Sequence, residues 1–519
     1  METSKKKFSF WLTFAAILSG LQLIAGVMVS VMCLKLNMFP GIYMAAIIMV
    51  LLALAALVFL MLYWTEVPRC QPDYEGKRHY VKRFIWTLIS VLIIAICLIA
   101  IAALDQLLAA MNAVTEVPSV VSENVNVYVM DEDPAESIED AITYTFGITE
   151  AYDYEHTKET ITMIRNLTGT EIETKTYDDV FAMVDGLYSG EVGAIILNET
   201  YVDVMADLDD YMTYEEDTRI IYSNAVETSL SNGVDITKSE ADQDGNGIAD
   251  GEEALSELGN SFVVYISGSD TRSTRLARSR SDVNILAIVN PDTKQILLVN
   301  TPRDYYVYTS ISPSNQDKLT HCGIYGINCS MDTLANLYGV PVEYYAQINF
   351  TGFETLVDAI GGVNVYSDAS FSAGSYSFTE GYNYMDGAKA LAFARERHAL
   401  QDGDHARGRH QMALIKAMIE KLTSSTALIS NYTGIMDSLT GMFATNVSTD
   451  KIGELVRQQL SEGGSWNITS YAVTGSNSSG YTYSMPNQTA YIMIPDTSSV
   501  ATAKSMIQQV IDGQVPSAE

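Results

Sequence analysis

Arginine is concentrated in four short segments of an otherwise acidic chain. The 519 residues contain 31 Lys and Arg against 63 Asp and Glu, which gives a net charge of −32. Nine of the twelve arginines beyond residue 110 nevertheless lie in these segments: Arg272, Arg275, Arg278 and Arg280; Arg303; Arg395 and Arg397; Arg407 and Arg409. Because the planar guanidinium group matches phosphate oxygens in a bidentate way, the clustering predicts that the fold gathers these side chains around an anion.

Carboxylates accompany the first two segments. Asp270 and Asp282 flank the first one, and Arg303 follows a predicted strand, at the kind of strand end where α/β sheets bind ligands. A magnesium ion between the two carboxylates and a phosphate would explain this combination. Lys318 is a weaker candidate cation. Taken alone, the first segment is also compatible with a solvated charge run, and Arg303 with a structural ion pair to its neighbour Asp304.

The last two segments point to an anion in different ways. Arg395 and Arg397 would share one face of a strand, where they repel each other unless an anion lies between them. Asp404, Arg407 and Gln411 lie at the start of a predicted long amphipathic helix. The N-terminus of a helix offers free N–H groups and the positive end of the helix dipole, which favour a bound anion.

Alternating strands and helices must position these segments. The patterns predict strands at 283–290, 295–300 and 344–349, a hairpin turn at 291–294, a helix at 407–422 and a loop at 475–480. Thr351, with Glu354 three residues on, predicts a helix start with a capping box. For residues 260–519 we therefore expect a three-layer α-β-α sandwich around one sheet.

A smaller α/β accessory domain is predicted over residues 111–235. The patterns give strands at Val125–Met130 and Val192–Leu197 and helices at Thr157–Asn166 and Tyr177–Leu187. It carries few candidate catalytic residues, and its role does not follow from the sequence.

The acidic linker at 236–259 carries a calcium-type loop. Counted from its first residue, oxygen ligands stand at positions 1, 3, 5, 7, 9 and 12, with a glycine at 6, which is the full EF-hand spacing. These ligands are Asp242, Asp244, Asn246, Ile248 through its carbonyl, Asp250 and Glu253. We expect a structural calcium site; the alternative is an acidic linker that binds nothing specific.

Residues 1–110 have the pattern of a membrane anchor. Three apolar stretches, at about 8–34, 36–64 and 84–106, are long enough to span a bilayer as helices. Basic residues precede the first stretch and separate the second from the third. The positive-inside rule then places the short N-terminus in the cytoplasm and the large C-terminal region outside the cell.

Composition bears on the class of binding partner, and the cysteines bear on whether the external region holds a disulfide. The acidic charge argues against a nucleic-acid partner, which rewards basic surfaces. Cys322 and Cys329 lie seven residues apart in the external region. They are compatible with a small disulfide loop or with two buried free thiols, because spacing does not fix geometry.

The order of the charged motifs resembles that of the LytR–CpsA–Psr family of envelope glycopolymer transferases. The motifs are GSDTR, RSD, PRD, KLTH, RERH and DGDxxRGRxQ, and they cover about residues 260–425. Capsule-type members of this family also have three N-terminal spans and a small accessory domain.

The resemblance implies a magnesium-dependent phosphotransferase. Such enzymes move a glycopolymer, a capsular polysaccharide or a teichoic-acid-like polymer, from an undecaprenyl-pyrophosphate carrier in the membrane to peptidoglycan. By motif, Asp270 and Asp282 would hold magnesium, and Asp404 would orient an arginine or help deprotonate the acceptor hydroxyl. The remaining predicted site residues would bind the pyrophosphate: Arg280, Arg303, Lys318, Arg395, Arg397, Arg407 and Gln411.

Two other functions fit the same motifs. The site could hydrolyse the lipid pyrophosphate with water as acceptor, which is chemically the same displacement. Alternatively, the chain could be a non-catalytic receptor that binds phospho-lipid glycans and regulates envelope assembly.

Overall fold

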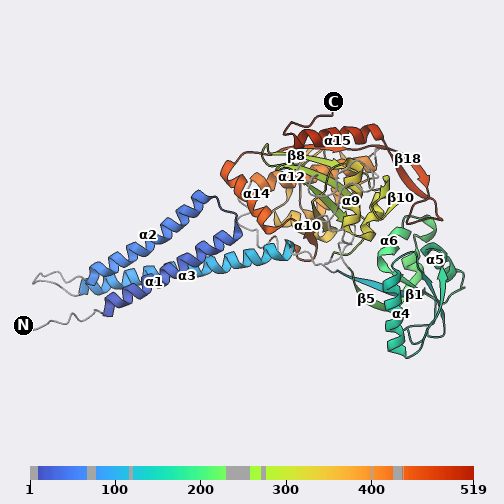
Figure 1. Ribbon diagram of the computed structural model, residues 1–519, viewed down its shortest axis with the longest axis horizontal. Coiled ribbons are helices and arrows are strands. Elements are labelled where there is room, and N and C mark those ends of the chain that lie inside the picture. Colours follow the sequence, from blue (N-terminus) through green and yellow to red (C-terminus); the bar gives the residue numbers. More distant parts are fainter. Residues whose placement is uncertain are drawn as a thin grey trace, which may run out of the picture. The chain divides into compact units, whose positions relative to one another are not determined.

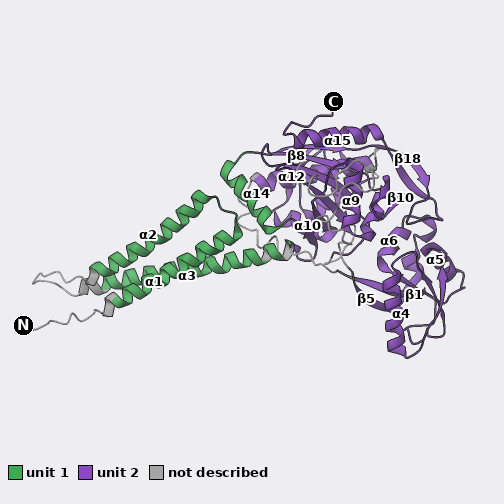
Figure 2. Cartoon of the chain, in the orientation of Figure 1, with its two compact units in different colours: residues 1–115, 431–437, 447–464 green, residues 116–430, 438–446, 465–519 purple. Residues whose placement is uncertain are grey.

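The computed structural model describes residues 10–66, 77–115, 121–228, 258–269, 276–397, 399–400, 403–424, 435 and 438–518. These residues form two compact units (Figure 2). One contains residues 1–115, 431–437 and 447–464, and the other contains residues 116–430, 438–446 and 465–519. The predicted calcium loop, Asp270, Arg272 and Arg275 lie outside the described residues.

The first unit is built on three apolar helices, α1 (Phe10–Leu36), α2 (Gly41–Glu66) and α3 (Lys77–Thr115), together with α14 (Thr449–Glu462). Each of the first three is long and apolar enough to cross a membrane. They match the three predicted stretches.

The second unit contains the accessory domain and a larger α/β part (Figure 1). The accessory domain is a five-stranded mixed sheet in the order β3-β2-β4-β1-β5. Its elements are β1 (Val121–Met130), β2 (Thr145–Thr149), α4 (Tyr154–Thr168), β3 (Glu173–Tyr177), α5 (Val180–Tyr188), β4 (Ala194–Asn198), α6 (Val202–Met205) and β5 (Thr218–Thr228). Helix α5 begins three residues later than predicted, because Asp179 caps it by accepting a hydrogen bond from Ala182 N at 2.8 Å.

The larger part is organised around a six-stranded sheet in the order β16-β11-β6-β7-β8-β17. Its strands are β6 (Phe262–Ser269), β7 (Val283–Asn290), β8 (Gln295–Asn300), β11 (Tyr344–Asn349), β16 (Phe443–Thr445) and β17 (Asn467–Ala472). The sequence predicted β7, β8 and β11 correctly, because each is a short apolar run bounded by turn residues.

Helices cover both faces of this sheet, which confirms the predicted layered sandwich. Helices α9 (Ile327–Tyr338) and α15 (Thr497–Ile511) share a buried apolar core with Leu297 and Val299 of β8. On the opposite face, α12 (Asp404–Ser424) approaches the Asn300 side chain so closely at Gly408 that a Cβ atom there would clash. This contact explains why a glycine separates Arg407 from Arg409.

Two local expectations were wrong. Helix α10 (Phe350–Ala359) is capped by Asn349, whose Oδ1 accepts a hydrogen bond from Gly352 N at 2.8 Å, and not by Thr351. Residues Gly475–Gly480 form strand β18, paired with β19 (Ala490–Pro495), and not a loop. Pairing with an apolar partner strand outweighs the weak strand propensity of glycine, serine and asparagine.

Candidate functional site

One edge of the central sheet gathers residues from distant parts of the chain. Gly268 pairs with Val283, and Ile285 pairs with Asn300, so the end of β6, the start of β7 and the end of β8 meet at this edge. Ser269 pairs with Asn349, which brings the end of β11 to the same edge. The register therefore juxtaposes Asp282, Arg303 and the start of α10, as predicted for ligand-binding loops at strand ends.

Two helices carry Arg395, Asp404, Arg407 and Gln411, and the predicted strand at Arg395 was wrong. Arg395 is the last residue of α11 (Gly387–Arg395) and does not lie on a strand. The segment is rich in alanine, the strongest helix former, and Asp386 caps it by accepting from Lys389 N at 2.9 Å. The strand argument for a shared face of Arg395 and Arg397 therefore does not apply.

Helices α11 and α12 are joined directly at the site. Gln411 Nε2 on α12 donates to the carbonyl of Ala394 at 3.3 Å, which holds the first turns of α12 against the end of α11. Arg407 lies on the same face of α12 as Gln411, one helical turn earlier, and both are buried. Burial raises the pKa of Asp282, but Arg303, Arg407 and Arg280 outweigh it and lower the pKa below its usual value. The helical and sheet-edge cations therefore act on one carboxylate.

Arg303 is surrounded by three carboxylates. Its NH1 donates to Asp282 Oδ1 at 2.8 Å, its Nε lies 3.5 Å from Asp304 Oδ2, and its NH2 lies 3.9 Å from Asp207 Oδ1. Lys318 Nζ lies 2.7 Å from Asp207 Oδ2 and 3.5 Å from Asp304 Oδ1. These residues, with Arg280 bound to Asp207, form a continuous network of alternating charge that we call the ionic network.

Asp207 is the member of this network that the sequence analysis missed. It follows α6 of the accessory domain, in a segment without motif or periodicity. Only the tertiary fold brings it to Arg280 and Lys318, more than 70 residues away in sequence. The clustered arginines predicted an anion, and this carboxylate is one anion that they hold.

His321 extends the ionic network inward. It is fully buried; Nδ1 lies 2.7 Å from Asp317 Oδ1, and Nε2 lies 3.7 Å from Asp207 Oδ2. Burial lowers the pKa of His321, but the two carboxylates outweigh burial, and the net effect is a raised pKa. A protonated His321 also balances the network: it gives four cationic and four anionic side chains, since Asp207, Asp282, Asp304 and Asp317 face Arg280, Arg303 and Lys318.

The raised pKa of His321 predicts that stability falls as the pH rises. Below about pH 6.5 both folded and unfolded states carry the proton; above it the unfolded chain loses the proton first, so folding stability decreases until the folded pKa is passed. The loss is at most about 1.4 kcal/mol per pH unit. Thermal unfolding of the full chain in detergent between pH 6 and 9 should show this slope, and His321→Gln should remove it. Parallel pH profiles for the two proteins would contradict the assignment.

Two of the predicted cations are exposed, in contrast to the ionic network. Arg395 and Arg397 lie at and just beyond the end of α11, with their side chains exposed to solvent. The Arg395 guanidinium stacks over the Phe350 ring, with Cζ 4.5 Å from the ring centroid. The site thus combines the buried ionic network with two exposed arginines, and one of these, Arg395, lies on the Phe350 ring.

His410, the neighbour of Arg409 on α12, does not line a polar rim. It is buried and stacks on Phe393 and Phe371, with ring centroids 4.0 and 5.0 Å apart. Burial lowers its pKa, so it packs as a neutral aromatic ring. Cys322 and Cys329 are buried free thiols, and the disulfide alternative is not realised.

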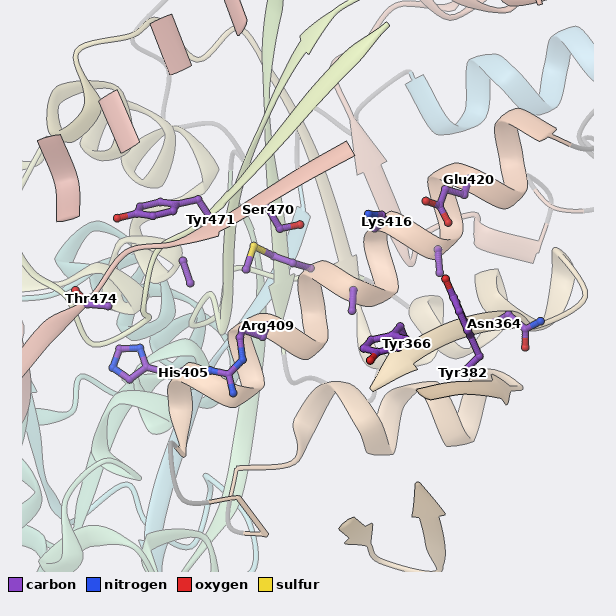
Figure 3. A pocket seen from close by; sticks show the side chains of 14 residues that line it. Asn364, Tyr366, Tyr382, His405, Arg409, Lys416, Glu420, Ser470, Tyr471 and Thr474 are labelled. Atoms are coloured by element: carbon purple, nitrogen blue, oxygen red, sulfur yellow. The ribbon is translucent and has the colours of Figure 1, made fainter. Parts of the chain in front are cut away.

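The opposite face of α12 lines a separate groove of about 820 Å³. Figure 3 shows His405, Arg409 and Lys416 along the helix, and Tyr366 and Tyr382 of the β12–β15 ribbon (Val363–Ser367 and Gly381–Met385) among the other lining residues. None of the predicted site residues whose side chains the structure describes lines this groove. Arg407 and Arg409 therefore have different surroundings, although both belong to one arginine motif.

The position of two predicted site residues is only partly described. Asp270 follows directly after β6 but lies outside the described residues. Asp404 begins α12, and the structure gives its backbone position. Their assigned roles stay predictions.

Comparison with known proteins gives a family match, several relatives and similar solved structures. The LytR_cpsA_psr family profile matches residues 222–499. The polyisoprenyl-teichoic acid–peptidoglycan teichoic acid transferase TagU of Enterococcus faecalis is 34% identical over 224 residues, which cover 43% of this chain and 73% of that protein. The same-named protein of Halalkalibacterium halodurans is 32% identical over 236 residues, covering 45% and 74%. The crystal structure of B. subtilis TagV is 24% identical with a TM-score of 0.42, and the match covers 50% of this chain and 99% of that chain.

The family profile spans more than half of the 519 residues, and it includes every described residue of the sheet-edge site and of the α11–α12 junction. The chain belongs to the LytR–CpsA–Psr family.

Proposed function

We propose that this protein is a membrane-anchored enzyme that transfers a glycopolymer from a polyprenyl-pyrophosphate carrier to peptidoglycan outside the cell. The observation that carries the proposal is that Arg303 and Arg407 act on Asp282 at one sheet edge, where Arg395 lies over Phe350 just after the end of β11. The transferase names of the relatives support the reaction class.

The chemistry is a displacement at phosphorus. A peptidoglycan hydroxyl attacks the phosphorus that carries the glycan, the bond from this phosphorus to the bridging oxygen breaks, and polyprenyl monophosphate leaves. A phosphodiester forms, and the hydroxyl proton is released, with Asp404 the candidate acceptor. Such a reaction depends on positioning and on neutralising charge at the leaving phosphate, which arginines at fixed positions supply.

The surroundings of Arg395 suit a lipid-linked substrate. Its guanidinium lies over Phe350, and Phe353 and Leu356 on the same helix are only partly buried. A cation on an apolar surface matches a molecule whose diphosphate is joined to a hydrocarbon tail. Helices α1–α3 would keep the protein at the membrane that holds this lipid.

We include magnesium in the proposal, with Asp282 and Asp270 as its protein ligands. The Asp282 side chain is 15% exposed and its Oδ1 accepts from Arg303, while Oδ2 accepts no hydrogen bond from the described residues. Those residues hold no metal-type cluster of three or more His, Cys, Asp or Glu, so further ligands would be water and phosphate, which suits magnesium. When bound, the ion would neutralise charge on the phosphates.

Chelation should therefore stop transfer, and added magnesium should restore it. Asp282→Asn should lower the rate at saturating magnesium about a hundredfold, because it removes a ligand and the partner of Arg303. Asp292→Asn is the matched control, since Asp292 lies in the turn at the other end of the β7–β8 hairpin. Full activity in chelator would exclude a metal-dependent reaction. The calcium site proposed for 242–253 is a separate, structural site.

The function is tested by product mass. Full-length protein in detergent is incubated with a polyprenyl-pyrophosphate-linked glycan, peptidoglycan fragments and magnesium. We expect a glycan–phosphate–peptidoglycan product and free polyprenyl monophosphate. Phosphorylated glycan without the linked product would identify a hydrolase, and unchanged donor would identify a receptor. Parallel reactions with a teichoic-acid donor and a capsular donor decide the glycopolymer class, for which the relatives' names favour teichoic acid and the three-helix architecture favours capsule.

A further inference from the structure

The accessory domain places a carboxylate inside the cation cluster of the larger α/β part. The Asp207 side chain is 8% exposed and forms an ion pair with Arg280. Its Oδ2 lies 2.7 Å from Lys318 Nζ and 3.7 Å from His321 Nε2, and its Oδ1 lies 3.9 Å from Arg303 NH2. Four cationic groups of one domain thus face a single carboxylate of the other.

This carboxylate remains ionised at neutral pH. Burial by itself raises the pKa of Asp207, but His321, Arg280 and Lys318 outweigh burial and hold the pKa well below its usual range. Asp207 is therefore a permanent counter-ion of the ionic network.

The contact between the two domains is extensive, which argues against a carboxylate that swings out to admit substrate. One apolar core contains Tyr201 and Phe181 of the accessory domain together with Ile324 and Met485 of the larger part. Tyr201 donates through its hydroxyl to the backbone carbonyl of Ser484. Withdrawing the accessory domain would expose this core, at a cost proportional to its apolar area.

A second buried ion pair secures the same interface. Arg278 Nε and NH2 donate to the two oxygens of Glu123 at 2.6 and 2.7 Å, and the Glu123 side chain is 0% exposed. Separating the domains would take the opposite charge away from both members of this pair.

Without Asp207, three buried cations would lose the carboxylate that they share. Among the described residues Lys318, with a side chain 3% exposed, would keep Asp304 at 3.5 Å, and Arg303 would lose one of its three flanking carboxylates. Neither side chain would then have a single preferred position.

We propose that Asp207 is a positioning residue for the anion site: through it, the accessory domain holds Lys318, Arg280 and Arg303 in place, so that one site is built from two domains. The proposal rests on the proposed function, and it gives the accessory domain a role. The substrate diphosphate contacts the arginines, and Asp207 acts on it through them.

The test compares Asp207→Asn with the wild-type full-length protein. We expect kcat/KM for the lipid-linked donor to fall about tenfold to a hundredfold, mainly through KM, because a charged hydrogen bond to the binding residues is lost. Titration with inorganic pyrophosphate should show the same loss of affinity. In a Lys318→Gln background, the Asp207→Asn substitution should have a smaller additional effect than in the wild type, because both changes remove the same ion pair.

Glu123→Gln is the matched control. It also removes a buried carboxylate from the domain interface, but its partner is Arg278, outside the ionic network. It should lower the unfolding temperature and leave kcat/KM and pyrophosphate affinity unchanged. If Asp207→Asn does not fold, Asp207→Glu carries the test, since it keeps the charge and shifts it by one methylene; it should fold and still raise KM.

Three results would overturn the proposal: unchanged KM in Asp207→Asn, full additivity with Lys318→Gln, or tighter pyrophosphate binding, which is the behaviour of a carboxylate that competes with substrate. Absence of turnover in the wild type would refute the proposed function alone, because the pyrophosphate titration still reports on the anion site.

Discussion

Replacing Arg407 with glutamine should lower the rate of glycopolymer transfer about a hundredfold, the usual loss when one group that stabilises transition-state charge is removed. Arg407 is buried in the first turns of α12, and it lowers the pKa of Asp282 at the sheet edge. Glutamine keeps most of the side-chain volume and removes the charge. The expected defect is therefore electrostatic.

Arg409→Gln is the matched control for this result. Arg409 lies two residues along the same helix, on the face that lines the groove in Figure 3, and its side chain is 40% exposed. It donates to Asp368 at 3.0 Å, an exposed ion pair of small energetic value. Its loss should change the transfer rate by less than about threefold. Equal rates for the two variants, measured with the same donor, would remove Arg407 from the site.

Replacing Arg278 with methionine should lower the free energy of unfolding by about 3–5 kcal/mol, more than any other single substitution considered. The change leaves the fully buried Glu123 without its bidentate partner. Substituting both residues, with Glu123→Gln added to Arg278→Met, should recover at least half of this loss, since no buried charge then remains. Thermal unfolding of full-length protein in detergent provides the measurement.

A surface ion pair in the accessory domain provides the control for Arg278. Arg165 lies 3.7 Å from Glu171, and both side chains are more than half exposed. Arg165→Met should cost less than about 1 kcal/mol. If Arg278→Met proved as mild as Arg165→Met, the buried pair would not be a principal contact between the accessory domain and the larger part.

Most of the sheet-edge site follows from sequence. Strands β7 and β8 are short apolar runs separated by a turn, so hairpin pairing alone places Asp282 and Arg303 at one edge of the sheet. The helix that carries Arg407 and Gln411 can also be predicted from the sequence, because its apolar residues recur with helical spacing.

Three features of the site were not predicted: the helix before Arg395, the packing of His410 and the position of Asp207. The last two depend on contacts between segments that are far apart in the sequence. A short alanine-rich segment before Arg395 fits either a strand or a helix by period alone, and its cap decides for the helix. His410 lies in a polar and charged stretch of sequence, which suggests an exposed side chain. Its ring instead packs against Phe371 and Phe393, which come from other elements. Asp207 meets its four partners only because the accessory domain docks on the larger part, and sequence separation conceals such a contact.

The central claim is that the clustered arginines bind a lipid diphosphate. Titration calorimetry of the full-length protein in detergent, with geranyl diphosphate and geranyl monophosphate as probes, tests it most directly. We expect the diphosphate to bind at least about tenfold more tightly, as one additional charge-assisted contact would provide, and we expect Arg395→Gln to reduce this preference. Equal affinities for the two probes in the wild type, or an unchanged preference in Arg395→Gln, would contradict the claim.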